Sequence, residues 1–488
     1  MTFPGPDINW VAFTPPLVLL LTAALAVLFA LYQESGRLTA QLSLLGLVVA
    51  ALFNLHLFQV VRQTDAFTSF GLRYLADTPA IAFNFVILIG TVLAVLMSYH
   101  YLERADLDHP EYYPLILLSA CGAMVMVAAG DLITLLLGLE IMSLAVYVLS
   151  AWRQGSRESE EAGMKYFLLG AFASAFLVYG IALLYGASGH FVYAEIAAVL
   201  RGDGFDQLLL ATLGGMLVLA GLAFKAALAP FHQWAPDAYT GAPTPVTAFM
   251  SVVVKAAAIA ALLRIFSSVF PDLSPLVGQV FAVLVALTLV LGNLAALFQR
   301  GVKRMLAYSA VAHAGYLGLA VLAAGTVGTR AAIWYLTAYT LMNVGAFAVL
   351  SLIADRNDRG DDLERFAGLG RMKPGLAAAL TVFLLSLAGI PPLAGFTGKI
   401  LVFQAALQAG YVALAIIGIV MSVVAVVYYF RVVAVMYFRE PEYELPAISS
   451  WATSMAIVVT VAGTVLLGIF PGWWYGLLQA GRQLLAGM

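Results

Sequence analysis

The chain has 488 residues, of which 63% are hydrophobic and only 10% are charged. Soluble domains carry about 45–50% apolar and about 25% charged residues, so this composition excludes a soluble globular protein and a disordered one. The net charge of -2 gives no basic surface for nucleic acid, and the single cysteine excludes a disulfide scaffold. An all-α membrane protein with several spans in the lipid bilayer is the class that remains.

About fourteen apolar runs are long enough to cross the roughly 30 Å hydrocarbon core as helices. They fall near residues 12–32, 39–61, 78–100, 113–129, 131–151, 163–187, 207–229, 245–268, 275–298, 303–324, 329–354, 375–408, 411–438 and 449–470. Proline and glycine interrupt the eighth and twelfth runs. No basic residue precedes the first run and no small-residue cleavage site follows it, so we expect no cleavable signal peptide.

Basic residues between the runs predict the orientation, because cytoplasmic loops of membrane proteins are enriched in lysine and arginine. One set of alternate loops holds thirteen: Arg37, Arg104, Arg153, Arg157, Arg300, Lys303, Arg304, Arg356, Arg359, Arg365, Arg371, Lys373 and Arg439. The other set, with the tail, holds five: Arg62, Arg73, Arg201, Arg330 and Arg482. The first set is therefore predicted in the cytoplasm, which leaves both termini on the non-cytoplasmic side.

Several charged residues lie deep inside the predicted spans. Glu140 lies nine residues past Asp131, and Lys255 lies nine residues past Val246, which is about 14 Å along a helix. Lys225 and Lys399 also lie within apolar runs, each close to a proline-containing segment. Each buried charge costs about 2.5–3.5 kcal/mol on insertion scales, so the four together cost on the order of 10 kcal/mol if unpaired. Intramembrane charges at this cost indicate a path for protons or ions.

Buried ion pairs that fix helix register are the alternative interpretation of these charges. Three deep lysines face only one deep carboxylate, however, so simple pairing cannot neutralise them all. Desolvation disfavours the charged form of a buried lysine, and a lysine that releases its proton readily can carry protons. Proton handling is therefore the preferred interpretation.

Three further residues are weaker or conditional candidates. Lys165 lies near a span end, where its amine could equally reach the headgroups. His232 follows Lys225 by seven residues and could pass protons between that lysine and the cytoplasm. His313 lies ten residues into its span, where a hydrogen-bonded core histidine is the more common situation. No metal-ligand spacing, dinucleotide fingerprint, phosphate loop or nucleophile triad is present.

Two proline-rich breaks accompany the deep lysines. One is KAALAPFHQWAPDAYTGAPTPVTAFM, from Lys225 to Met250, and the other is SLAGIPPLAGFTGK, from Ser386 to Lys399. Interrupted spans at corresponding positions of two halves indicate inverted repeats. We therefore expect spans 1–3 in residues 1–112, a five-helix repeat of spans 4–8 in 113–268, an inverted repeat of spans 9–13 in 269–440, and span 14 with the tail in 441–488.

Four segments resemble the antiporter-like, proton-pumping membrane subunits of respiratory complex I, the proton-translocating NADH:quinone oxidoreductase. They are LGLEIMSLAVYVL, AFKAALAPFHQWAPDAYTGAPTPVTAFMSVVVKAAA, KRMLAYSAVAHAGYLGL and LSLAGIPPLAGFTGKILVF. The resemblance covers residues 113 to 440, and the second segment is long enough to be highly specific. The lysine at 399 and the short tail after the last span favour the subunit N branch, called subunit 2 in mitochondria.

The resemblance implies roles for single residues. Glu140 resembles the family's fifth-span glutamate, which modulates the charge of the seventh-span lysine, here Lys225. His232 and Lys255 resemble the relay along the central hydrophilic axis, and Lys399 resembles the twelfth-span exit residue.

Two positions are less certain matches to the family. Lys165 resembles the sixth-span lysine. His313 stands in the tenth span, where related subunits can carry lysine, so the residue that bridges the two halves stays open.

The resemblance also implies a function that the residues alone do not show. Electrons would pass from NADH through FMN and iron–sulfur clusters to quinone in other subunits, while this chain translocates protons and holds no redox cofactor itself. The implied partners are the neighbouring antiporter-like and small subunits of the membrane arm, in the inner membrane of a bacterium. A subunit of a multi-subunit cation/proton antiporter and a membrane subunit of an energy-converting hydrogenase are the alternatives.

Overall fold

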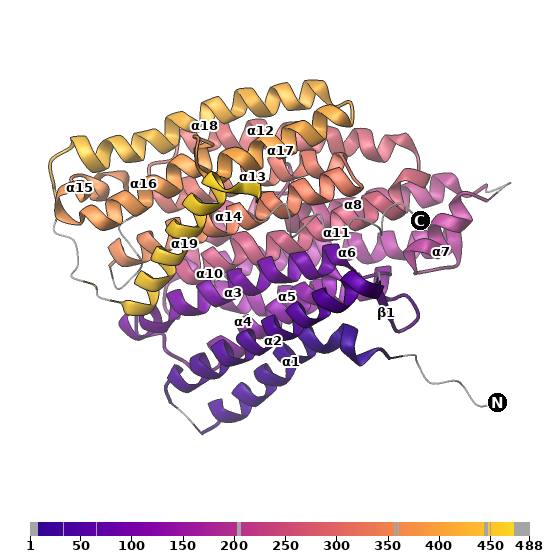
Figure 1. Cartoon of the computed structure of the whole chain (residues 1–488), viewed down its shortest axis with the longest axis horizontal. Helices are drawn as coiled ribbons and strands as arrows, with labels where there is room; N and C mark the ends of the chain where they lie inside the picture. Colours follow the sequence, from indigo (N-terminus) through magenta and orange to yellow (C-terminus); the bar gives the residue numbers. More distant parts are fainter. Residues whose placement is uncertain are drawn as a thin grey trace.

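The computed structural model describes residues 8–32, 34–64, 66–202, 206–355, 358, 361–443, 448 and 450–472. In these ranges the protein is all-helical apart from one short hairpin of β1 (Phe67–Ser69) and β2 (Tyr74–Ala76). Most helices run side by side along the long axis of the molecule (Figure 1). Both chain termini, predicted on the non-cytoplasmic side, lie outside the described residues, as do Arg356, Arg359 and Arg482.

Each of the fourteen predicted runs contains a helix. These are α1 (Trp10–Ala30), α2 (Arg37–Thr64), α3 (Thr78–Arg104), α4 (Tyr112–Val127), α5 (Leu132–Ser150), α6 (Arg157–Ser188), α8 (Leu208–Ala226), α10 (Thr244–Phe249) with its continuation α11 (Lys255–Ser268), α12 (Pro275–Leu297), α13 (Val302–Leu322), α14 (Thr326–Ile353), α16 (Pro374–Ala388) with α17 (Ala394–Gln408), α18 (Val412–Phe438) and α19 (Trp451–Ile469). Among the described residues, 12 helices are long and apolar enough to cross a bilayer, and α4 and α16 are shorter apolar helices.

Short elements join these helices where the sequence predicts none. They are α7 (Tyr193–Leu200), α9 (Trp234–Gly241), α15 (Leu369–Met372) and the 3-10 turns η2 (Phe270–Asp272) and η3 (Leu363–Phe366). The π-helical turn η1 (Met250–Val254) joins α10 to α11. Too few residues form each of these elements for a periodic pattern to reveal them.

The predicted interruptions are real breaks in the helices. α8 ends at Ala226, and the chain resumes a helix only at Trp234. The helix is therefore shorter than the predicted run 207–229. α16 ends before Gly389, whose φ of 89° is a left-handed conformation that favours glycine, and α17 begins at Ala394. In contrast, the eighth run stays helical from Thr244 to Ser268, because its prolines lie at or before the first turn.

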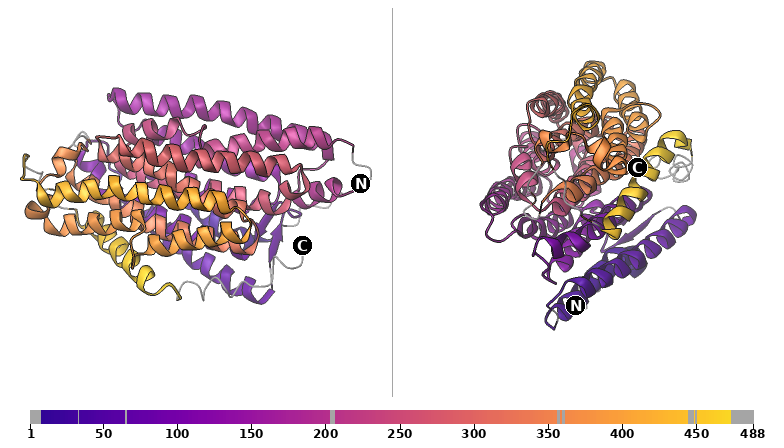
Figure 2. Two further views of the ribbon diagram at one scale, coloured as in Figure 1. Left: turned by 90° about the horizontal axis from the view of Figure 1, so that it is seen from above. Right: turned by 90° about the vertical axis from the view of Figure 1, so that its left-hand side faces the viewer.

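Three elements form the centre of the bundle: α10 with α11, α13 and α14. Nearly every residue of these helices is buried, whereas α1, α2, α6, α18 and α19 carry many exposed leucine, valine and phenylalanine side chains. The end-on view in Figure 2 shows outer helices surrounding inner ones. In a bilayer the exposed apolar side chains face lipid, so the buried polar groups described below are kept from it.

The C-terminal helix α19 returns to the N-terminal part of the chain. It packs against α3 and α14, and Figure 1 shows it crossing the bundle beside α3. Across the bundle, the Arg264 guanidinium of α11 forms a bidentate ion pair with Asp77, at 2.9 and 3.0 Å. Asp77 also caps α3 by accepting the Ala80 N–H. These contacts hold the predicted first segment, residues 1–112, against the later helices.

Two glycines allow α4 and α5 to approach closely. A Cβ added at Gly122 would lie 2.4 Å from the backbone nitrogen of Met142, and one at Gly138 would lie 2.5 Å from that of Met126. Close approach of backbones through small residues is a common basis of helix association in membranes. This contact positions α5, the helix that carries Glu140.

We predict that Gly122→Val destabilises the protein by about 1–3 kcal/mol or more, because a branched side chain has no space against α5. The measurement is the melting temperature of the purified protein in mild detergent. Gly278→Val in α12 is the matched control, because an added Cβ there meets no atom within 4 Å. Equal melting temperatures for the two variants would contradict the prediction.

Candidate functional site

Glu140 lies in the middle of α5 and is partly exposed. The helix begins where the sequence predicts, because the Asp131 side chain accepts the Thr134 N–H at 2.6 Å as an N-cap. The Ser174 hydroxyl of α6 donates a hydrogen bond to Glu140 Oε1 at 2.6 Å. A neutral hydroxyl is thus the hydrogen-bond partner that α6 provides for this carboxylate.

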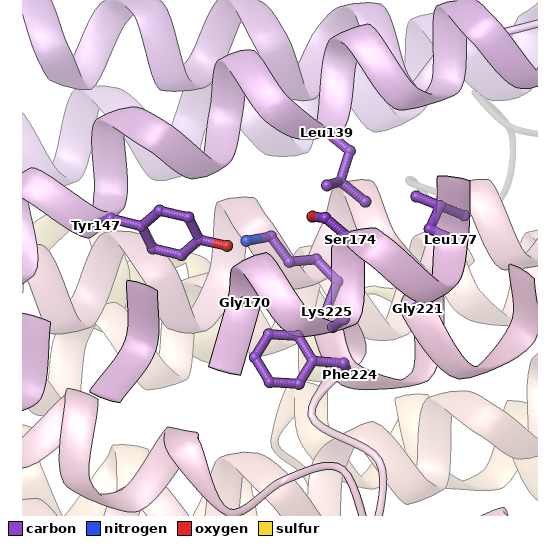
Figure 3. Close-up of a pocket in the computed structure, with 9 residues that line it drawn as sticks. Leu139, Tyr147, Gly170, Ser174, Leu177, Gly221, Phe224 and Lys225 are labelled. Atoms are coloured by element: carbon purple, nitrogen blue, oxygen red, sulfur yellow. The ribbon is translucent and has the colours of Figure 1, made fainter. Parts of the chain in front are cut away.

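Lys225 lies in the last turn of α8 and is 3% exposed. Its Nζ donates to the Tyr166 hydroxyl at 3.2 Å and lies 5.1 Å from the Tyr147 ring centroid. Figure 3 shows the amine directed toward the Tyr147 hydroxyl, with Ser174 beside it. A small cavity of about 10 Å³ lies among Lys225, Tyr147 and Ser174. Lys225 and Ser174 thus line the same cavity, and Ser174 is also hydrogen-bonded to Glu140.

The first break follows Lys225 directly. Ala227 takes a left-handed conformation with φ of 59°, and the Ala229 N–H donates to the Thr288 hydroxyl of α12 at 2.8 Å. The indole of Trp234 stacks on Tyr166 with ring centroids 4.1 Å apart and donates to the Phe224 carbonyl oxygen. Packing and hydrogen bonds of this kind satisfy the backbone groups that a broken membrane helix leaves free.

His232 lies within this break, between α8 and α9. Its Nδ1 is buried and has no hydrogen-bond partner among the described residues. A buried polar atom normally has a partner, so this nitrogen is a candidate for a water-mediated contact. Within the described part of the chain, no direct hydrogen bond joins His232 to Lys225 or Lys255.

Lys255 is the first residue of α11, directly after the π-helical turn η1. It is 2% exposed, and its Nζ donates to the backbone oxygen of Ala310 in α13. The amine also lies 5.4 Å from the centroid of the Tyr339 ring. Single π-helical turns inside α-helices occur often at functional sites, and this one sets the direction of the lysine.

His313 lies in α13 between two tyrosines. Its Nδ1 is 2.7 Å from the Tyr335 hydroxyl, and its Nε2 is 3.3 Å from the Tyr429 hydroxyl. The histidine is 1% exposed and interacts electrostatically with both Lys255 and Lys399. Both ring nitrogens of His313 thus face tyrosine hydroxyls, and its electrostatic interactions connect it to Lys255 and Lys399.

Lys399 lies in the second turn of α17 and is 5% exposed. Its Nζ donates to the backbone oxygen of Ala388, the last residue of α16, at 2.8 Å. It also lies 4.9 Å from the Tyr316 ring centroid. The second break thus supplies a free carbonyl oxygen as the partner of a buried amine.

Lys165 differs from the three deep lysines. Its side chain is 42% exposed and its Nζ pairs with Glu161 at 2.6 Å and Asp237 at 2.8 Å. Arg304 of α13 pairs with the other oxygen of Asp237 at 2.8 Å. Lys165 therefore belongs to a solvent-accessible ion network, which joins α6, α9 and α13.

The structure brings the candidate residues together in two clusters. One holds Glu140 and Lys225 around Ser174, and the other holds Lys255, His313 and Lys399. The buried tyrosines that line them were not identified from the sequence: Tyr147, Tyr166, Tyr316, Tyr335, Tyr339 and Tyr429. Tyrosine in an apolar helix has no distinctive spacing, so nothing in the sequence separates these from ordinary core residues. Among the described residues no group of three His, Cys, Asp or Glu could hold a metal ion.

Comparison with known proteins places the chain in one family. A family model described as NADH:quinone oxidoreductase/Mrp antiporter, TM, matches residues 129–425. NADH-quinone oxidoreductase subunit N of Trichlorobacter lovleyi is 43% identical over 452 residues, which cover 92% of this chain and 91% of the relative. NADH-quinone oxidoreductase subunit N 1 of Herpetosiphon aurantiacus is 42% identical over 488 residues, which cover 98% of each chain.

Solved structures share the fold of this chain. A chain of respiratory complex I from Thermus thermophilus with bound aureothin has a TM-score of 0.81 and 38% identity, covering 96% of this chain and 100% of that one. A chain of an archaeal membrane-bound sulfane sulfur reductase has a TM-score of 0.87 and 27% identity, covering 98% of each. A chain of the Mrp complex from Dietzia sp. shares the fold, with a TM-score of 0.84 at 22% identity.

We predict that Gly389→Ala displaces Lys399 as well as straining the backbone. A Cβ at Gly389 would lie 2.9 Å from Lys399 Cδ. Gly410→Ala is the matched control, because its φ of 85° is similar and an added Cβ there meets nothing within 4 Å. The left-handed conformation costs both variants about 1–2 kcal/mol, so the excess loss of melting temperature in Gly389→Ala measures the lysine contact. Equal losses would show that this contact does not matter.

Proposed function

Because this chain belongs to the subunit N family of NADH-quinone oxidoreductase, the antiporter-like, proton-translocating membrane subunits of complex I, we propose that its buried ionisable residues carry the protons. The residues are Glu140, Lys225, His232, Lys255, His313 and Lys399. Electron transfer from NADH to quinone in other subunits supplies the driving force.

One observation carries this proposal: the three deep amines have neutral partners. Lys225 donates to a tyrosine hydroxyl, and Lys255 and Lys399 donate to backbone carbonyl oxygens. Among the described residues none of the three has a carboxylate within 4 Å, although the charged residues at the helix ends are commonly ion-paired. A buried amine without a counter-charge exchanges its proton more easily than one in an ion pair.

Coulombic coupling connects Glu140 to this system. Glu140 interacts electrostatically with Lys225, and Ser174 lies between the two side chains. The negative charge of Glu140 attracts the ammonium form of Lys225, so neutralising Glu140 promotes proton release from that lysine. Movement of charge at Glu140 would thus start a transfer across the protein.

The second cluster then passes the proton onward. His232 would connect Lys225 to Lys255 through water, and its buried Nδ1, which has no side-chain partner among the described residues, supports a water contact there. His313, between Lys255 and Lys399, is the bridge between the two halves, with Tyr335 and Tyr429 orienting its ring. Lys399 is the exit residue. Lys165, which is exposed and already paired, has a supporting role at most.

The proposed architecture has fourteen spans and two inverted repeats. α4 to α11 form the first repeat, in residues 113–268, and α12 to α18 form the second, in residues 269–440. Each contains one broken helix with a lysine beside the break, which supports the relation. Residues 1–112 and 441–488 flank the repeats. Each repeat has five spans. Because this number is odd, the second repeat starts on the opposite side of the membrane from the first and is inverted relative to it.

The chain is a multi-pass membrane protein of complex I, and we place it in the inner membrane of a bacterium with both termini on the non-cytoplasmic side. Its proposed neighbours are antiporter-like and small subunits of the membrane arm. NADH, FMN, iron–sulfur clusters and quinone are proposed to bind to the rest of the complex. The relatives from bacteria and the distribution of basic loop residues support this placement.

Two alternatives share the fold: a subunit of a multi-subunit cation/proton antiporter and one of an energy-converting hydrogenase. The likeness to the sulfane sulfur reductase and Mrp chains shows why the fold alone does not separate them. This chain is 43% and 42% identical to two subunit N relatives over 92% and 98% of its length, which favours complex I.

Purification of the tagged chain in mild detergent tests this assignment. We expect flavin, iron and NADH:quinone activity to elute with the chain, because subunit N is held in the complex by its neighbours. Elution with other membrane proteins but without flavin, iron or that activity would favour the antiporter. The same preparation from cells that lack the tag is the control.

We predict that Lys225→Met, Lys255→Met and Lys399→Met each lower the number of protons translocated per NADH oxidised, because methionine fills the same space without a titratable group. Lys165→Met is the matched control and is expected to have a much smaller effect. The measurement is proton uptake by liposomes that contain the purified complex. An unchanged proton ratio in Lys225→Met would contradict the proposed mechanism.

A further inference from the structure

The end of the bundle that carries the loop between α14 and α15 contains a buried ion cluster. The Asp358 side chain is 1% exposed and lies between two cations: Lys303 Nζ at 2.7 Å and Arg153 Nη2 at 3.2 Å. The Thr244 hydroxyl donates to the same carboxylate at 2.8 Å, and Lys303 also donates to the Ala242 carbonyl oxygen. Asp358 therefore joins the loop after α5, the start of α10 and the start of α13.

A second carboxylate, Asp361, lies beside this cluster. It accepts the Lys303 N–H at 3.3 Å through Oδ2. A cavity of about 10 Å³ is lined by both aspartates together with Lys303 and Thr244. This volume holds about one water molecule, and the lining offers the two to four polar partners that a buried water needs. The cavity is thus a suitable water site between Asp358 and Asp361.

Polar side chains lead from this cavity toward Lys255. Along α10 and η1, Ser251 follows Thr244 by seven residues and precedes Lys255 by four. Across from it, the Asn343 amide of α14 donates to the Ser251 hydroxyl at 2.7 Å. Asn343 lies one turn from Tyr339, whose ring is 5.4 Å from the Lys255 amine. α14 and the segment of α10 and η1 therefore place polar groups at several points between this cavity and Lys255.

Several of these groups lack a partner. Among the described residues, the buried Tyr339 hydroxyl, Thr340 hydroxyl and Asn343 Oδ1 have no hydrogen-bond partner. Buried polar atoms are nearly always hydrogen-bonded, either to protein or to ordered water. Three such atoms within two turns of one fully buried helix are candidates for hydrogen bonds to ordered water.

We propose that Asp361 receives protons from the aqueous phase at this end of the bundle and delivers them to Lys255 through water along Asn343, Ser251 and Tyr339. In each transfer a proton moves to Asp361 as a carboxyl O–H and leaves it to the next water, and Lys255 finally accepts it. Asp358 is a positioning residue, which keeps Lys303 and Thr244 around the cavity. The proposal rests on the proposed function of Lys255.

The charges around the cavity support different roles for the two aspartates. Burial raises the pKa of Asp361, against the opposing attraction of Lys303, and its neighbour Asp362 raises it further. Burial also acts to raise the pKa of Asp358, but Lys303 and Arg153 outweigh it, so that the pKa of Asp358 is lowered. Asp358 thus stays charged as an anchor, whereas Asp361 exchanges its proton.

A purely structural role is the alternative, in which Asp361 only holds the start of α13. Proton translocation by the purified complex in liposomes separates the two, measured as protons per NADH with and without an uncoupler. We expect Asp361→Asn to lose as much of the proton ratio as Lys255→Met, with uncoupled electron transfer retained, and Asp361→Glu to retain the ratio. Glu364→Gln is the matched control, because the Glu364 side chain is exposed in the same loop, and the ratio should stay unchanged.

An unchanged proton ratio in Asp361→Asn, with a lowered ratio in Lys255→Met, overturns this inference and leaves the proposed function intact. An unchanged ratio in Lys255→Met overturns both. If Asp361→Asn does not assemble into the complex, Asn343→Leu tests the same path without altering the loop. We expect the same loss for that variant, and an unchanged ratio overturns the path.

Discussion

The central constraint on this protein is that three lysine amines lie in the interior of a helical bundle, with no carboxylate partner among the residues that the structure describes. Each amine must be hydrogen-bonded, because an unsatisfied polar group in a bilayer costs several kcal/mol. Helices normally use all their carbonyl groups internally, so the bundle provides acceptors in unusual ways. The broken helix before α17 frees the Ala388 oxygen, and Tyr166 offers a hydroxyl to Lys225. The breaks, the π-helical turn and the tyrosines thus all lie around the buried amines and provide their surroundings.

This constraint also explains why the most buried helices carry the most polar groups. α10 with α11, α13 and α14 hold Lys255, His313 and the tyrosines around them, and the outer helices keep these groups from lipid. Ion pairs occur instead toward the ends of the helices, as at Asp77 with Arg264 and at Asp237 with Arg304. Paired charges there fix the helices in place, whereas the described amines in the interior donate to neutral groups.

Contacts between the two halves occur at more than one depth. In the interior, Lys255 of α11 donates to α13. Nearer the loop, adjacent residues of α13 hold two different carboxylates: Lys303 binds Asp358, and Arg304 binds Asp237. The first turn of α13 therefore forms ion pairs both with the broken segment around α9 and with the loop after α14. A shift of either segment would displace the first turn of α13 and, through it, the other segment, because packed interiors transmit strain.

The sequence by itself determined the number of the apolar runs, the two breaks and the deep charges, because each depends on hydrophobicity or on proline over a short stretch. It also identified Glu140, Lys225, Lys255 and Lys399, since a charge in an apolar run is visible without any structure. Only the tertiary structure decided which groups meet. The tyrosines around His313, the role of Asp358 and the pairing of Lys165 with Asp237 join residues distant in sequence. No local pattern encodes such contacts, because they arise only when the helices pack.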